Sequence, residues 1–271
     1  MENTDGPQGN LLKFSCIGCH ARTFNGSDGR ASSIGGPSAP QVGPMAAPPA
    51  GPLISGGYFS TSSDASTHNV ADIPSTAPDS VLMLKTASAP GGSFALQNGT
   101  KPKLRCDSCH DPAVRHSAAG SVRSGTAGSS YRMLHGTTGN QYVKGTGDVD
   151  FEAGTGQNQY DAASMNLFCA NCHGLFHGSA GTSSGGAWVR HPTDVTTNSY
   201  GANYIGGDKV VPVGDAGLTA DGHTNQVMCL SCHRAHGNAS PDMLRFNYSG
   251  ADNRAGDNTA SQGCETCHGD K

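Results

Sequence analysis

The sequence predicts a mostly irregular fold, with short helices at five cysteine motifs and little other regular structure. Leu, Ile, Val and Phe make up about 14% of the 271 residues, and values below roughly 20% leave too few side chains for a conventional apolar core. Gly (39) and Pro (15) account for about 20%, which is typical of loops and turns. The pattern C-x-x-C-H occurs five times and uses all ten cysteines. The net charge is only -4, so the chain is not a polyelectrolyte, and something besides aliphatic side chains must supply its interior.

The five motifs are typical of covalent haem attachment. Two thiols at this spacing form thioether bonds to the haem vinyl groups, and the histidine that follows binds the iron on one side. We therefore expect five c-type haems, which are flat apolar plates, to form the interior of an irregular wrapper that does not fold without them. The attachment residues are Cys16, Cys19, Cys106, Cys109, Cys169, Cys172, Cys229, Cys232, Cys264 and Cys267, and the axial histidines are His20, His110, His173, His233 and His268.

Seven further histidines are available as second axial ligands. Five irons need five of them to be six-coordinate, and imidazole is a ready ligand for haem iron. The expected distal ligands are His68, His116, His177, His191 and His236, with His135 as a further candidate and His223 as a spare. Methionine is the rival ligand, and Met165, Met228 and Met243 are alternatives, although methionine more often fills gaps in a core.

The spacing within a motif also predicts that some distal histidines serve a neighbouring haem. His236 follows His233 by three residues, so on a short helix both rings point the same way. A second ligand must approach the iron from the opposite side. We therefore expect His236, and by the same argument His177 and His116, to bind a neighbouring haem, which requires closely packed haems.

The chain is expected to form one unit over residues 1–271. Its N-terminal part, 1–52, carries the first motif and ends in a proline-rich segment that favours an extended course. The remainder, 53–271, is expected to pack around the other haems. Residues 53–70 are strand-like at most, and residues 241–248 are expected to form one helical turn or a strand.

Composition and spacing argue against several other classes. The balance of charge gives no basic footprint for nucleic acid, and no apolar run approaches the roughly 18 residues of a membrane span. Zinc ribbons place two C-x-x-C units about 15–20 residues apart, closer than here, and a thioredoxin-type site needs only one. Disulfides would leave the regular spacing and its histidine unexplained. No signal peptide is visible, so we expect a mature exported chain, because c-type haem is attached outside the cytoplasm.

Several segments resemble the multihaem c-type cytochromes that metal-reducing bacteria export. They are FCANCHGLFHG, WVRHPTDV, VMCLSCHRAHG and PDMLRFNY, with weaker similarity at LISGGYF…HNV and SSYRML. The nearest group is the OmcE-type extracellular cytochromes, which polymerise into filaments. The resemblance covers most of 53–268 and is densest from 165 to 248. It implies stacked bis-histidine haems with His68, His177, His191 and His236 as distal ligands and His116 as a looser match, but that group carries four haems and this chain has five motifs.

The expected function is electron transfer without catalysis, because six-coordinate iron leaves no open position for a substrate. The resemblance implies an extracellular or cell-surface filament subunit whose partners are copies of itself, head to tail, and other redox proteins or extracellular electron acceptors. A monomeric periplasmic electron shuttle is the first alternative. The second is a multihaem reductase such as a nitrite reductase, whose catalytic haem uses C-x-x-C-K, whereas all five motifs here end in histidine.

Overall fold

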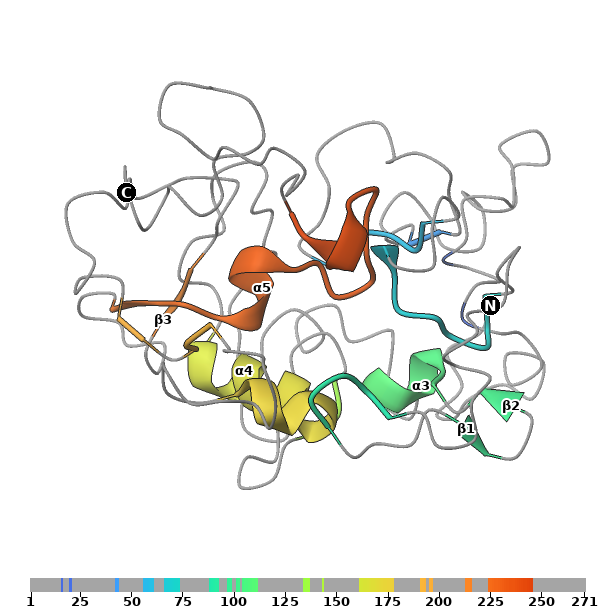
Figure 1. The fold of residues 1–271 in the computed structure, drawn as a ribbon, viewed down its shortest axis with the longest axis horizontal. Coiled ribbons are helices and arrows are strands. Elements are labelled where there is room, and N and C mark those ends of the chain that lie inside the picture. Colours follow the sequence, from blue (N-terminus) through green and yellow to red (C-terminus); the bar gives the residue numbers. More distant parts are fainter. Residues whose placement is uncertain are drawn as a thin grey trace, which may run out of the picture.

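The structure is a computed structural model, and its described part covers four of the five motifs at least in part (Figure 1). The fifth motif, with Cys264, Cys267 and His268, lies outside the described residues, as do Cys19, His116 and His223. The described residues are 16, 20, 42–43, 56–60, 66–73, 88–92, 97–98, 101–102, 104–111, 134–136, 143, 161–177, 191–193, 195–196, 213–215 and 224–245.

Two four-residue helices form at the second and fourth motifs, as expected. They are α3, Cys106–Cys109, and α5, Cys229–Cys232. Each has a serine at its third position whose hydroxyl accepts the N–H of the residue before the helix, at 2.9 Å for Ser108 and 3.1 Å for Ser231. This contact satisfies an amide that would otherwise lack a partner at the helix start. The sequence C-x-S-C therefore contains its own cap for a single helical turn.

The third motif lies at the end of a longer helix than the sequence led us to expect. Helix α4 spans Ala162–His173, and the 3₁₀ turn η5, Gly174–Phe176, follows it. The helix begins seven residues before Cys169, in a run of Ala, Ser, Met and Leu that contains no Gly or Pro to interrupt it. Asp161 starts it by accepting hydrogen bonds from the Met165 amide at 3.1 Å and the Ser164 hydroxyl at 3.2 Å. The described residues otherwise have the mostly irregular fold with few short helices that the sequence predicts.

Strands in the described residues are limited to two antiparallel two-residue pairs. They are β1, Gln97–Asn98, with β2, Lys101–Pro102, and β3, Gly214–Asp215, with β4, Asn225–Gln226. The described residues of 53–70 make isolated bridges, at Gly57, Ser60 and Thr67, which agrees with the strand-like interpretation. The 3₁₀ turn η8, Pro241–Met243, and a bridge from Leu244 to His233 agree with the expectation for 241–248 within 241–245, and 246–248 lie outside the described residues.

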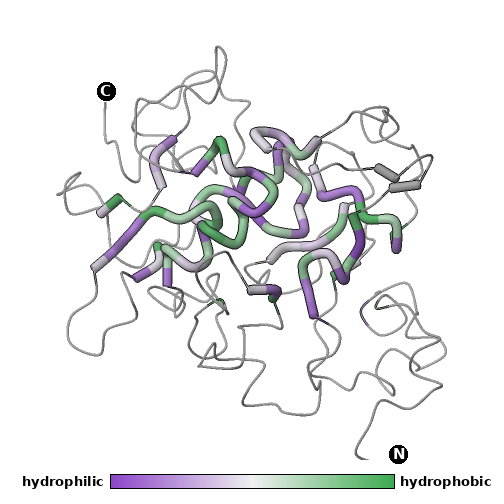
Figure 2. The backbone as a smooth tube through the Cα atoms, turned by 90° about the horizontal axis from the view of Figure 1, so that it is seen from below, coloured by the Kyte–Doolittle hydropathy of each residue, from purple (hydrophilic) through white to green (hydrophobic). Residues whose placement is uncertain are grey.

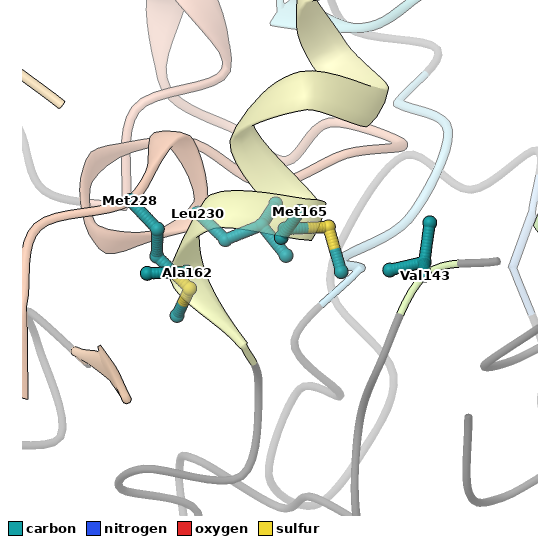
Figure 3. Packing of buried hydrophobic residues seen from close by; sticks show 5 residues of the cluster. All are labelled: Val143, Ala162, Met165, Met228 and Leu230. Atoms are coloured by element: carbon teal, nitrogen blue, oxygen red, sulfur yellow. The ribbon is translucent and has the colours of Figure 1, made fainter. Parts of the chain in front are cut away.

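Within the described residues, the buried apolar side chains form two small clusters. One cluster joins Met228 and Leu230 around α5 to Ala162 and Met165 of α4, with Val143 beside Met165 (Figure 3). Met165 and Met228, two of the three alternative axial ligands, are thus core residues in the described structure, whereas Met243 is half-buried. The other cluster consists of Phe59, Val70 and Leu104. Hydrophilic and hydrophobic stretches interleave along the backbone (Figure 2), and no helix among the described residues is apolar and long enough to cross a membrane.

Asn166 ties the third motif to the fourth. Its side chain is fully buried on α4, where the Nδ2 group donates to the Val227 carbonyl at 3.2 Å. Its Oδ1 accepts the Cys229 N–H at 2.7 Å. Because Cys229 is the first residue of α5, this one side chain fixes the start of the fourth motif against the helix that ends in the third.

Candidate haem-binding sites

The described motifs share one backbone geometry. The N–H of the motif histidine donates to the carbonyl of the first cysteine, at 3.1 Å for His20 and 3.0 Å for both His110 and His233. This is the bond of a single helical turn, and residues three and four apart on such a turn lie on one face. In the second and fourth motifs the two cysteines are three residues apart on such a turn and therefore lie on one face, and the motif histidine follows directly.

Backbone carbonyls hold several of the imidazole rings through Nδ1. The His173 ring pairs with the Pro90 carbonyl at 2.6 Å, and the His233 ring with the Asp242 carbonyl at 2.8 Å. His68 pairs in the same way with the Ala235 carbonyl at 2.6 Å. With the proton on Nδ1, the other ring nitrogen, Nε2, has the lone pair that binds a metal. These contacts orient the rings as axial ligands are oriented in haem and zinc proteins.

Two pairs of imidazole rings lie opposite each other. The ring centroids of His68 and His173 are 6.1 Å apart with 40° between the planes. Those of His110 and His236 are also 6.1 Å apart, at 45°. In each pair, one ring belongs to a motif and the other to the expected distal set. The structure thus brings together a motif ligand and a candidate distal ligand from distant parts of the chain, twice.

The separation of the rings matches two ligands of one metal ion. A metal–imidazole bond is about 2.0–2.1 Å long for zinc, and with the ring centre roughly 1.1 Å beyond the nitrogen, two opposed rings have centroids roughly 6 Å apart. Ordinary aromatic pairs also fall within about 4.5–7 Å, so the distance alone does not distinguish the two. The Nδ1 contacts of His68 and His173 distinguish a metal-binding pair from an ordinary aromatic pair, because both rings keep Nε2 available for a metal. The residues present therefore fit a haem with two imidazole ligands.

Burial keeps three of these imidazoles neutral. Burial, together with the neighbouring imidazole of His110, lowers the pKa of His236 to about 3, and burial is the larger cause. Burial likewise lowers the pKa values of His68 and His233, although backbone hydrogen bonds oppose the shift. At pH 7 each ring is therefore in the neutral form that binds a metal.

The motif thiols are neighbours in motif order. A hydrogen bond between Cys16 and Cys106 lowers the pKa of the Cys16 thiol to about 7 and raises that of Cys106. Burial and the charge of Cys172 raise the pKa of Cys109 to about 11. A hydrogen bond to Cys229, followed by burial, raises the pKa of Cys169. Motif one thus adjoins motif two, motif two adjoins motif three, and motif three adjoins motif four.

The helix expected to carry both His233 and His236 is shorter than assumed. Helix α5 ends at Cys232, and His233 is already extended, with φ -113° and ψ 156°. The two rings therefore do not share a helical face, and that assumption was wrong. His236 nevertheless lies opposite His110 of the second motif, at the distance given above.

The remaining described candidates are less completely positioned. His135 uses Nε2, the usual metal-binding nitrogen, to contact the Asp107 carbonyl at 2.8 Å, and its amide donates to the Cys109 carbonyl at 2.9 Å. His191 is exposed, with Nδ1 3.0 Å from the Pro192 carbonyl. His177 follows η5, and its amide lies 3.4 Å from the Gly174 carbonyl.

Two phenylalanine rings at the site were not anticipated from the sequence. Phe59 lies 4.9 Å from the His236 ring, and Phe176 stacks on His173 at 6.2 Å with 14° between the planes. Gly91 makes room for Phe176, because a Cβ there would lie 2.8 Å from that ring. The segment LFH after the third motif could have suggested the Phe176 contact, since η5 directly follows His173. Nothing in the sequence pattern points to Phe59.

Among the described residues, no disulfide joins any of the seven cysteines, and no three His, Cys, Asp or Glu side chains converge as metal ligands do. What that part of the chain shows instead is paired imidazoles beside paired cysteines.

Comparison with known proteins gives a consistent set of similarities. The family model described as outer membrane cytochrome MtrC/MtrF-like, domains II/IV, matches residues 93–271. The C-type cytochrome OmcS of Geobacter sulfurreducens is 28% identical over 231 residues, which is 59% of this chain and 51% of that protein. The chain thus spans about half the length of this curated relative.

Two solved structures are also similar. One is a cryo-EM structure of the OmcS nanowires from Geobacter sulfurreducens, with 21% identity and a TM-score of 0.46 over 75% of this chain and 68% of that one. The other is the outer membrane cytochrome S filament from the same organism, with 23% identity and a TM-score of 0.43 over 76% and 67%.

Proposed function

Because the chain belongs to the MtrC/MtrF-like family of outer membrane cytochromes, we propose that it conducts electrons through five covalently bound c-type haems. The observation that carries this proposal is the two opposed imidazole pairs, His68 with His173 and His110 with His236, because each joins a motif histidine to an expected distal ligand. Thiols of successive motifs also lie close together, as Cys16 does to Cys106 and Cys169 to Cys229. Thiols that adjoin in motif order place successive tethers side by side. Haems attached there form a continuous path, with the fifth haem attached at Cys264 and Cys267.

The chain's own residues fix the haems and keep substrates away. The proposed proximal ligands are His20, His110, His173, His233 and His268. The proposed distal ligands are His68, His116, His177, His191 and His236, with His135 as a further candidate. Haem supplies the one-electron chemistry, while the protein sets spacing, axial ligands and solvent exposure. With two imidazoles on each iron there is no open position, so the protein is an electron carrier and not an enzyme.

Mass spectrometry of the intact protein, isolated from a host that matures c-type cytochromes, tests the haem proposal. We expect the mass of the chain plus five haems, and an electron paramagnetic resonance (EPR) spectrum of low-spin ferric haem with two imidazole ligands. Free thiols or bound zinc in place of thioether bonds would overturn the proposal. A high-spin haem in the resting protein would instead favour a reductase.

We further propose that the chain is the repeating subunit of an extracellular filament like those of the OmcE-type cytochromes. The similarity to OmcS, whose solved structures are described as nanowires and a filament, supports this. An asymmetric contact that repeats head to tail without closing produces such a polymer. Light scattering and electron microscopy of native material should show filaments. A population of monomers would instead support a periplasmic shuttle, with the same electron-carrying role.

A further inference from the structure

We propose that three chain segments form a clasp that positions two distal ligands at once. The clasp consists of residues 56–58, 66–68 and 235–238, and it presents His236 to the haem of the second motif and His68 to the haem of the third. This inference rests on the proposed function, because it presupposes haems at those motifs. Its new content is that the two haems keep or lose their second ligand together.

The clasp is held by a dense set of contacts around His236. The carbonyl of this residue accepts the His68 amide at 3.3 Å and the Thr67 hydroxyl at 2.6 Å. The His68 ring bonds the adjacent Ala235 carbonyl at 2.6 Å. The remaining bonds are His236 N–H to Gly56 O at 2.7 Å, Tyr58 N–H to Gly237 O at 2.9 Å and Asn238 N–H to Ser66 O at 3.0 Å. The position of the His68 ring is therefore set by the backbone of the residues that carry His236.

Two glycines let the segments approach this closely. Gly57 and Gly237 have φ values of +70° and +125°, which disfavour any residue with a side chain. A Cβ at Gly237 would collide with the Ser66 carbonyl and lie 2.7 Å from the Thr67 Cα. One at Gly57 would collide with the Gly237 carbonyl and lie 2.8 Å from the Arg234 Cβ. A side chain at either position must separate the segments of the clasp.

Separation of the segments acts on both imidazole pairs. The His236 ring is 6.1 Å from His110, and the His68 ring is 6.1 Å from His173. Gly237 is the residue after His236, and it contacts Ser66 and Thr67, which directly precede His68. A Cβ at Gly237 therefore displaces the two distal rings from their partners in one movement. Gly57, Thr67 and Gly237 are thus positioning residues for two irons that none of them binds.

Binding of carbon monoxide to the reduced holoprotein tests the clasp, because this gas binds ferrous haem that lacks a sixth ligand. We expect no bound gas per chain in the wild type, one in His68→Ala, one in His236→Ala and two in Gly237→Ala. Gly174→Ala is the matched control, because a Cβ there contacts nothing within 4 Å although the residue adjoins His173. This control should bind none.

The outcomes separate the clasp from the function it rests on. If each histidine variant binds one equivalent but Gly237→Ala binds none or only one, the clasp is refuted and the haem proposal stands. If the histidine variants bind none, the assigned ligand pairs are refuted. If the wild type carries no haem, both proposals fall.

Thr67→Val decides the matter if Gly237→Ala does not yield a protein with five haems. This change removes the hydroxyl bond to the His236 carbonyl at nearly constant volume. On heating, the low-spin signal of the wild type should include one step with the amplitude of two haems, and Thr67→Val should lower the midpoint of that step alone. Two separate steps of one haem each would refute the clasp.

Discussion

Replacing Asn166 with Ala should weaken the connection between the third and fourth motifs. The side chain is fully buried and makes two hydrogen bonds, to Val227 and Cys229. Each such bond contributes about 0.5–1.5 kcal/mol, so the pair contributes about 1–3 kcal/mol. The buried Val227 carbonyl also loses its partner, which adds about 1 kcal/mol or more. We therefore expect the free energy of unfolding to fall by about 2–4 kcal/mol.

Guanidinium unfolding of the holoprotein, followed by the low-spin haem absorption, measures this loss. The matched control is Asn171→Ala, on the same helix, because Asn171 is exposed and its single contact to the Gly136 carbonyl is long, at 3.4 Å. This control should change the free energy by less than about 0.5 kcal/mol. Equal effects of the two substitutions would refute the assignment of Asn166 as the link between the motifs.

Three further substitutions test other contacts at the motifs. Asp72→Ala should lower the free energy of unfolding in guanidinium by about 1–2 kcal/mol, because this buried carboxylate accepts the first amide N–H of α3 at 2.9 Å. The control, Asp107→Ala, removes an exposed carboxylate and should lower it by less than about 0.5 kcal/mol. Equal losses would contradict the capping role of Asp72. Gly91→Ala places a side chain at φ +67° and should lower the free energy of unfolding by about 1–2 kcal/mol. The added Cβ should displace Phe176 from the His173 ring and shift the EPR signal of the third haem, and an unchanged spectrum would count against that contact. His135→Ala should retain five low-spin haems, because Nε2 already bonds a carbonyl, and a new high-spin haem would identify His135 as an iron ligand.

The local structure of the described motifs could be predicted from the sequence, because the motifs contain groups that shape them. Ser108 and Ser231 cap their own turns, and His20, His110 and His233 each close the turn onto the first cysteine, four residues earlier. Helix α4 is longer than predicted because the run of residues before the third motif, which includes no Gly or Pro, also forms helix. That run was visible in the sequence.

The pairing of imidazoles could not be predicted from spacing. His68 and Ala235 are 167 residues apart, and only tertiary contacts decide that their segments meet. The importance of Gly57 and Gly237 was equally hidden, because the chain has 39 glycines and no pattern distinguishes these two. The backbone contacts of His135 were also invisible, because the Asp107 carbonyl that its ring bonds carries no sequence signal.

The distance along the chain between the two halves of the clasp has a consequence for biogenesis. A polypeptide exported from its N-terminus presents His68 early, but the carbonyls that orient its ring, at 235 and 236, arrive only after most of the chain has crossed. Closing a flexible loop of about 170 residues costs about 4–5 kcal/mol in entropy, so tethered cofactors must first shorten the path. If the proposed haems are attached before the C-terminal segment is exported, His68 would not yet be oriented toward the haem of the third motif. The contacts of Ala235 and His236 would then complete that site last.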